Sequence, residues 1–414
     1  MKLSATFLLA STGLFIVSPS CLRQQSPDDP RALATFRTQV EKALPAVASL
    51  SGSEKPESIR VGLFTRTELG AYFRKYLTVE YPDGELTKRG RSFALIGLLP
   101  RGYDLEQGFV SVLSAQAGAV YDPRSKTLIG LRDLVTERDR AVDDRMILAH
   151  ELTHALQDRM IDIARVSEAA RENVDYEYAL RAVLEGMASS VMLAYAQDRP
   201  LGALPPLKDF WRSQLSRAPG GSLGGSPPYL TEYLISPYAE GGAFVQNWHE
   251  KHPGAPLCDL LKSIPASSEQ VLHYEKYSSG DLPATIDLSP ARRVVPRTWN
   301  REYANVLGEL DLAVLFQIHT ATGDNADALA AGWDGCRFET YAGEDGETVL
   351  FGTSVWDSEN DAEEFAGGFS DVLDECRPER DYGIVQVEQR THFVVGASDG
   401  GLRKDILEAL AVRR

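Results

Sequence analysis

The segment ILAHELTHALQD, residues 147–158, carries two histidines and a glutamate at a spacing suited to metal chemistry. His150 and His154 are four positions apart, so on a helix they project from one face and can reach the same metal ion. Glu151 is turned about 100° around the helix, which takes it past the metal and towards a water bound there. The pattern predicts a hydrolytic zinc site with Glu151 as general base.

The alternative for this segment is a solvated surface helix in which Glu151 pairs with a nearby cation. A solvated face would not be bracketed by so many apolar residues, and this favours the buried site. The flanking positions are uncharged: Ile147, Leu148, Ala149, Leu152, Thr153, Ala155 and Leu156.

A catalytic zinc needs three protein ligands and one open position for water. Glu185 is the candidate third ligand, because it lies in a helical stripe of mostly small residues that would let the histidine helix approach closely. A carboxylate in such a stripe needs a partner, which a metal supplies. A salt bridge to Arg181, four residues earlier, is the alternative. Three other acidic residues are less suited, because their connection is polar and expected at the surface: Glu168, Glu172 and Glu177.

The segment SSEQVLHYEKY, residues 267–277, offers a further catalytic candidate. His273 could donate a hydrogen bond to the oxyanion of a tetrahedral intermediate, with Tyr274 and Tyr277 behind it. A half-buried His273 with a structural hydrogen bond is the open alternative. Asp158, one turn beyond His154, could orient a ligand histidine, but we expect it on the helix surface.

Apolar periodicity places these residues on regular elements. Helices are expected from caps at Asp143 and Asp144 to about residue 164, and over residues 175–197 and 238–252. Apolar runs on both sides of a turn in residues 116–131 predict a β-hairpin, and residues 60–66 a strand. The Gly- and Pro-rich residues 199–228 are expected to be irregular, as in active-site lids.

After residue 296 the pattern changes to a helix, two strands, a helix, two strands and a last helix. This order predicts a separate α+β domain over residues 296–414, after a larger domain over residues 32–295. Its aromatic residues are expected in the core rather than in a binding site: Trp333, Phe338, Trp356 and Phe365.

The first twenty residues have one early lysine and an apolar stretch too short to span a membrane, as in a secretory signal. Cys21 follows small residues, as in a lipoprotein cleavage box. We therefore expect export to the cell envelope and a lipid anchor at Cys21, followed by a tether over residues 21–31. In an oxidising compartment Cys336 could bridge to Cys376, although two buried free cysteines fit equally well.

The net charge of -16 argues against nucleic acids and anionic membrane surfaces as partners. It identifies no substrate.

HELTHALQD resembles the zinc helix of thermolysin-like gluzincins, and LEGMAS resembles the segment of their third ligand. The spacing differs: 30 residues lie between His154 and Glu185, about ten more than that family uses, and Ser189 stands where the family has an aspartate. In gluzincins an edge strand beside the helix binds an extended peptide, and AGAVYD or KTLIGL resembles that strand.

A closer resemblance extends over most of the mature chain. It links AGAVYDPRSKTLIG, AHELTHALQD, ALRAVLEGMAS, SSEQVLHYEKY, GWDGCRF and VWDSENDAEEF to uncharacterised exported bacterial and archaeal proteins grouped as metallopeptidases. It implies an α+β protein with a zincin-like domain, Zn²⁺ as cofactor and a peptide or protein substrate. Hydrolysis of another amide or an ester would use the same site. The alternative is a catalytically silent, surface-anchored binding protein whose metal is structural.

Overall fold

The computed structural model describes residues 30–412, except 117, 133–140, 216–222, 224, 320–324, 345 and 378. The expected signal segment, Cys21 and nearly all of the tether lie outside the described residues. The fold is α+β with two sheets, as expected, and no helix in the described ranges is long and apolar enough to cross a membrane.

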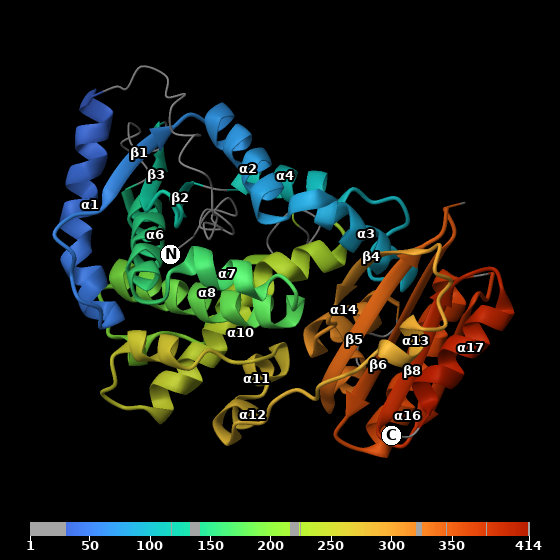
Figure 1. The fold of residues 1–414 in the computed structure, drawn as a ribbon. Helices are drawn as coiled ribbons and strands as arrows, with labels where there is room; N and C mark the ends of the chain where they lie inside the picture. Colours follow the sequence, from blue (N-terminus) through green and yellow to red (C-terminus); the bar gives the residue numbers. More distant parts are fainter. Residues whose placement is uncertain are drawn as a thin grey trace.

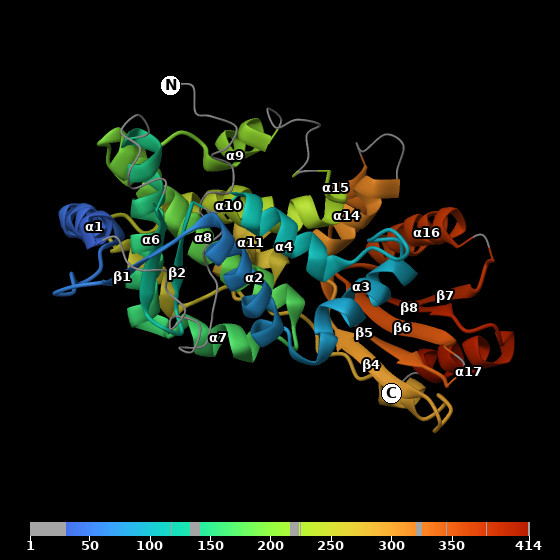
Figure 2. The same cartoon turned by 90° about the horizontal axis from the view of Figure 1, so that it is seen from above.

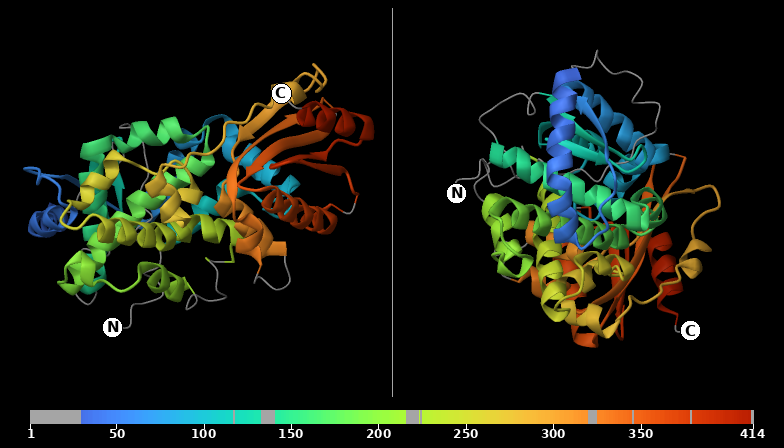
Figure 3. Two further views of the ribbon diagram at one scale, coloured as in Figure 1. Left: turned by 90° about the horizontal axis from the view of Figure 1, so that it is seen from below. Right: turned by 90° about the vertical axis from the view of Figure 1, so that its left-hand side faces the viewer.

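The smaller sheet contains β1 (Arg60–Phe64), β2 (Ala119–Asp122) and β3 (Thr127–Leu131) in the order β1-β3-β2. β2 and β3 form the expected antiparallel hairpin, whereas β1 runs parallel to β3. Since β3 is paired on both sides, only β2 of the two expected peptide-binding strands is an edge strand. Helix α1 (Pro30–Ser51) packs along this sheet (Figure 3).

Three long helices lie at the centre of the molecule beside this sheet (Figure 1). They are α6 (Ala141–Ile161), α8 (Val174–Gln197) and α10 (Pro228–Lys251). α8 and α10 approach closely at Gly186 and Gly241, where a Cβ on either glycine would overlap the backbone of the other helix. The contact therefore requires glycine at both positions.

Two boundaries differ from expectation. α6 begins at Ala141, so Asp143 and Asp144 lie inside the helix rather than at its N-cap. The segment expected to be irregular contains the turn η5 (Leu201–Ala203) and helix α9 (Leu207–Leu215), and α10 begins ten residues earlier than expected. Buried Leu207 and Trp211, one turn apart, hold α9 in place. α10 continues through Pro237 because residues on both sides of that position are buried and the helix packs along α8.

Shorter helices complete the larger part of the chain. The Thr65 side chain and Glu68 form a capping box at the start of α2. The remaining elements are α2 (Arg66–Glu80), η3 (Pro82–Gly84), α3 (Glu85–Leu95), α4 (Leu105–Gln116), α7 (Ile163–Ala170), η7 (Leu257–Lys262), α11 (Ser268–Leu272), α12 (Tyr274–Ser279) and α13 (Ser289–Arg292).

The second sheet is antiparallel, with strand order β4-β5-β6-β8-β7. α16 covers one face and α17 the other (Figure 2). The order expected from the sequence is confirmed, but β4 was not expected because its residues, NREYAN, form no apolar run. The elements are β4 (Asn300–Asn305), α14 (Glu309–His319), α15 (Ala326–Ala330), β5 (Trp333–Ala342), β6 (Thr348–Trp356), α16 (Glu359–Cys376), β7 (Tyr382–Val387), β8 (Arg390–Gly396) and α17 (Gly400–Ala411).

The hydrophobic core is continuous between the two parts of the chain. Phe93 of α3 packs against Phe338 of β5, with ring centroids 6.3 Å apart. The aromatic residues expected in the core are buried there, including Trp333 and Trp356. Cys336 and Cys376 are free, so the possible bridge between them is not formed.

Candidate metal centre

His150 and His154 of α6 face Glu185 of α8, and their ligand atoms converge. His150 Nε2 lies 3.0 Å from Glu185 Oε2 and 2.9 Å from His154 Nε2. The third separation, between His154 Nε2 and Glu185 Oε2, is 3.6 Å. The structure thus brings together all three ligands expected from the sequence.

These separations fit one ion. Three ligand atoms each about 2.0–2.1 Å from a tetrahedral zinc lie about 3.4 Å from one another, and the observed separations fall on both sides of that value. Both histidines are fully buried and Glu185 is 2% exposed. A buried carboxylate facing two imidazoles, each able to offer a lone pair, is a donor set that a divalent cation would satisfy.

Glu185 has histidine partners rather than the arginine of the alternative reading. The Arg181 guanidinium lies instead over the ring of Tyr233, 4.4 Å from its centroid. Burial alone would raise the pKa of Glu185, but the charge of His154 and hydrogen bonds from His150 and His154 lower it to about 2. The carboxylate is therefore ionised and ready to bind a cation.

Gln157 orients the second histidine. Its Nε2 donates to the carbonyl oxygen of Leu184, at 3.0 Å, so its Oε1 must face His154 Nδ1, 2.8 Å away. The acceptor Oε1 holds a proton on Nδ1, so the loss of the Nε2 proton on metal binding would leave the lone pair of His154 Nε2 directed at the candidate ion. The same side chain ties α6 to the residue that precedes Glu185.

Glu151 is anchored by one oxygen. Its Oε2 accepts a hydrogen bond of 2.7 Å from the backbone N–H of Tyr121 in β2. Its Oε1 is buried without a hydrogen-bond partner among the described residues. Burial and, secondly, the charge of Glu185 raise the pKa of Glu151 to about 8, against the lowering effects of His154 and the Tyr121 N–H. A cation bound beside it would lower that pKa.

Two further side chains belong to the surroundings of the cluster. Tyr238 of α10 stacks on the His150 ring, with 5.9 Å between centroids and 20° between planes. Ser189, at the position of the family's aspartate, is buried, and its hydroxyl has no hydrogen-bond partner in the described part of the chain. It therefore orients neither histidine.

Asp158 is buried, which corrects the expected surface position. Its carboxylate accepts hydrogen bonds from the Tyr121 hydroxyl at 2.7 Å and the Ile163 N–H at 2.9 Å. Lys126 Nζ lies 2.8 Å away. Asp158 therefore links α6 to the β2–β3 hairpin and to the start of α7 rather than orienting a ligand.

The rejected acidic candidates fall into two groups. Glu168 and Glu172 are exposed, as expected. Glu177 is buried, contrary to expectation, and its carboxylate lies 3.3 Å from Arg89 and accepts a hydrogen bond from the Tyr81 hydroxyl at 2.7 Å.

His273 was a candidate donor to the oxyanion of a tetrahedral intermediate, but in the structure it bonds to a carboxylate. Its Nε2 lies 2.8 Å from Glu309 Oε1, at the start of α14. Among the described residues, its ring nitrogens face Glu309 and Glu275 and make no hydrogen bond or ion pair with the metal cluster or Glu151. Burial alone would lower the pKa of His273, but the stronger effect of the Glu309 hydrogen bond raises it. The ring therefore connects the two parts of the chain.

Lys276, three residues later, makes the same kind of connection. Its ammonium lies 3.1 Å from Glu269, 2.9 Å from Asp281 and 2.7 Å from Asp357. Among the described residues, these three carboxylates form the other group close enough together to hold a metal, and they already surround the Lys276 ammonium.

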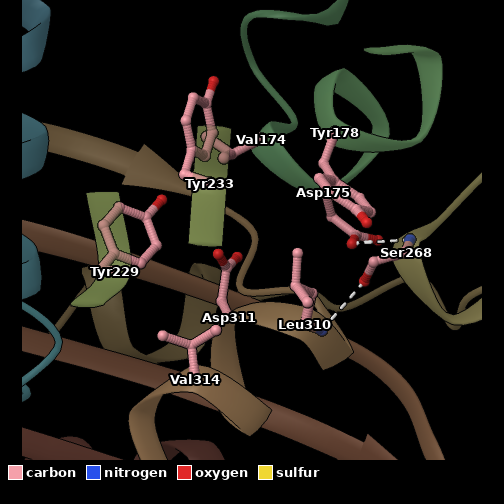
Figure 4. Close-up of a pocket in the computed structure, with 9 residues that line it drawn as sticks. All are labelled: Val174, Asp175, Tyr178, Tyr229, Tyr233, Ser268, Leu310, Asp311 and Val314. Carbon is pink, nitrogen blue, oxygen red and sulfur yellow. Dashed lines mark hydrogen bonds between the residues drawn. The ribbon is translucent and has the colours of Figure 1, made fainter. Parts of the chain in front are cut away.

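Figure 4 shows the small cavity beside this junction. Asp175 of α8 accepts a hydrogen bond of 2.9 Å from the Ser268 N–H, and the Ser268 hydroxyl accepts one of 3.3 Å from the Leu310 N–H. Burial raises the pKa of Asp175 to about 7 and that of Asp311 to about 6. The segment SSEQVLHYEKY therefore holds the C-terminal part in place.

The region from residue 293 to residue 406 matches a family model described as a domain of unknown function, DUF8575. It contains β4 to β8 and most of α17 but none of the candidate ligands. The chain matches no curated protein and no solved structure. None of these comparisons indicates an activity. A functional conclusion therefore depends on the geometry of the candidate metal centre.

Proposed function

We propose that this chain is an exported zinc-dependent metallopeptidase with a zincin-like fold. The observation that carries the proposal is the convergence of His150 Nε2, His154 Nε2 and Glu185 Oε2 on one point. Two histidines and one carboxylate form a ligand set of catalytic zinc, which leaves a fourth position for water.

In this proposal the three ligands and Glu151 have separate roles. His150, His154 and Glu185 would hold Zn²⁺, which supplies a Lewis acid that polarises a carbonyl and lowers the pKa of water. Glu151 would take a proton from the attacking water on Oε1 and deliver it to the leaving amine. The Tyr121 N–H holds Oε2, so only one oxygen is left for proton transfer.

The edge strand β2 is our candidate for binding an extended peptide, because it is unpaired on one side and contacts α6. Tyr121, in the middle of β2, already donates its N–H to Glu151. A peptide added to this edge would therefore lie beside the general base.

One observation favours the second candidate, a surface-anchored binding protein with a structural metal. His150, Glu151 and His154 are all 0% exposed. A structural site is closed to solvent, whereas a catalytic site admits substrate.

The deciding experiment compares wild-type protein with Glu151→Ala, because Glu151 is not a ligand in this proposal. We expect about one zinc per chain in both by elemental analysis, and cleavage of unfolded casein by wild-type protein only. The exposed Glu168→Ala is the control and should behave like wild type. No zinc after supplementation would contradict the metal site, and equal cleavage by Glu151→Ala would contradict the mechanism.

The proposed export includes lipidation at Cys21, which lies outside the described residues. In a bacterial host the wild-type protein should fractionate with membranes, and Cys21→Ser should be released from them. Retention of the variant in the membrane fraction would contradict the anchor.

A further inference from the structure

Two buried carboxyl groups meet where α8 contacts the C-terminal part of the chain. Asp175 lies in the first turn of α8 and Asp311 in the first turn of α14, and both are buried. Both lie beside Gly308: a Cβ on that glycine would overlap Asp175 Oδ1, and its N–H donates to Asp311 Oδ2 at 3.0 Å. The two acids therefore share one neighbouring residue at this junction.

The space that they line is too small to hydrate two charges. Asp175 and Asp311 line a cavity of about 10 Å³, which they reach from α8 and from α14 (Figure 4). That volume holds at most about one water molecule. Apart from Ser268, the rest of the lining consists of aliphatic side chains and tyrosines: Val174, Leu310, Val314, Tyr178, Tyr229 and Tyr233. An ionised carboxylate would lose most of its hydration here.

Within the described residues, no arginine, lysine or histidine forms an ion pair with either acid. The cations of the junction have other partners: Arg89 pairs with Glu177, His273 with Glu309, and Lys276 with Glu269. The further titratable groups around the two acids are Glu177 and Tyr178 of α8, Arg89 of α3, Tyr229 and Tyr233 of α10, Glu309 of α14 and Cys336 of β5. A buried acid without a counter-ion is neutralised most readily by a proton.

Burial keeps both groups protonated well above the usual range of a carboxylic acid. It raises the pKa of Asp175 to about 7, although hydrogen bonds from Ser268 lower it. It raises the pKa of Asp311 to about 6, although the Gly308 N–H and the charge of Arg89 lower it. In an opened junction water reaches both groups, and each pKa returns towards about 4. The closed junction thus holds protons that the open one releases, so rising pH favours opening.

We propose that Asp175 and Asp311 form a proton-controlled latch, which holds the C-terminal part of the chain on α8 in acid and loosens it when both groups ionise. Asp175 accepts a hydrogen bond from the Ser268 N–H, and the Ser268 hydroxyl accepts one from the Leu310 N–H. A group that titrates therefore also ties α8 to α14. The latch concerns how the C-terminal part is attached and does not rest on the proposed peptidase function.

The chain carries its own probe of this junction. Cys336 of β5 is buried; burial raises the pKa of its thiol, and the charges of Asp311 and Asp175 raise it further. Cys258 of η7 is also buried, but its thiol bonds to the Gly52 carbonyl in another part of the chain, so it serves as internal reference. Maleimides react with exposed thiolates, and the ratio of the two labelling rates cancels the direct effect of pH on thiols.

The test uses the full wild-type chain. It is treated with N-ethylmaleimide at several pH values, and labelling of each cysteine is followed by mass spectrometry. We expect the ratio of Cys336 to Cys258 labelling to rise at least about tenfold between about pH 5.5 and about pH 7.5, because each proton released on opening contributes up to about tenfold per pH unit. A ratio that stays constant or falls would overturn the proposal without any variant.

A variant assigns the change to the two acids. Asp175→Asn combined with Asp311→Asn keeps an oxygen for the Ser268 and Gly308 N–H groups but cannot ionise, so the ratio should stay nearly constant with pH. Asp371→Asn, at an exposed position of α16, is the matched control and should follow wild type.

Two other groups could produce a similar change. The Glu309 hydrogen bond raises the pKa of His273, and that pair also weakens as pH rises. Equal pH dependence in wild type and the double asparagine variant would assign the change to His273 and overturn the latch. A cation in the cavity is the other way to neutralise two carboxylates. Suppression of Cys336 labelling at neutral pH by calcium or potassium, at matched ionic strength, would show a metal site instead of protons and would also overturn it.

Discussion

Gln157 and His154 form a hydrogen bond of 2.8 Å whose direction is fixed by a third group, the Leu184 carbonyl. A carbonyl oxygen can only accept, so it sets the orientation of the amide, and the amide sets the tautomer of the imidazole. One side chain thus prepares a ligand on α6 and connects it to the helix that carries Glu185.

Removal of this side chain should weaken metal binding. We expect Gln157→Ala to lower zinc affinity about 10- to 100-fold in a competition assay with a chelating dye, because His154 loses the acceptor that holds its ring. Gln246→Ala is the matched control: its amide bridges Leu207 N and the Pro205 carbonyl, and no ligand. Equal zinc affinity for Gln157→Ala and wild type would contradict the role.

Zinc bound at the proposed site should stabilise the native protein, since that site is built from two helices. At a free zinc concentration one thousand times the dissociation constant, the gain is about 4 kcal/mol. We expect an upward shift of the unfolding temperature on adding zinc to metal-free protein, reversed by a chelator. The shift should be absent in Glu185→Ala. An equal shift in that variant would place the metal elsewhere.

Gly308 should be intolerant of any side chain. A Cβ there would overlap Asp175 Oδ1 and lie 2.5 Å from the Ser268 hydroxyl. Gly308→Ala should therefore lower the free energy of unfolding by about 2–4 kcal/mol in urea denaturation. Gly367→Ala, at an exposed helical position with no atom within 4 Å of the added Cβ, should instead be neutral or slightly stabilising. Similar results for both would argue against the close contact at Gly308.

His273 offers a test between its two readings. If its role is the bond to Glu309, then His273→Ala and Glu309→Ala should each lower the unfolding temperature, and the double variant should lose less than the sum of the two. Zinc content and cleavage of casein should stay close to wild type. Loss of cleavage with an unchanged unfolding temperature would restore the oxyanion role.

Stability should fall as pH falls below neutrality because of His392. Burial and the charge of Arg390 lower the pKa of His392 to about 4 in the folded protein. The unfolded chain therefore takes up the proton first, and the contribution of His392 is complete above about pH 6.5 and lost as pH falls towards 4. As pH falls from about 6.5 to about 4, we expect the unfolding free energy of wild type to fall by up to about 3 kcal/mol relative to that of His392→Gln. A difference in unfolding free energy that stays constant with pH would contradict the lowered pKa of His392.

The convergence of the three candidate ligands could be predicted because their positions follow from helix periodicity. The i, i+4 spacing of His150 and His154 and the small residues around Glu185 are properties of single helices. The strands and helices after Trp333 could also be predicted from the sequence, since each has a clear apolar period.

Other features depend on contacts between distant segments. Gln157 has no distinctive local pattern, and its role appears only when α8 lies against α6. Asp158 is buried because the β2–β3 hairpin covers it. His273 meets Glu309 across 36 residues, and no local spacing predicts such a pair.

The complete burial of both candidate ligand histidines has a kinetic consequence for any metal bound between them. A chelator cannot reach an ion enclosed between α6 and α8, so release must wait for a local opening of these helices. The dissociation rate would then be set by the protein and would not rise with chelator concentration. A metal bound at this site would therefore stay with the chain even where free zinc is scarce.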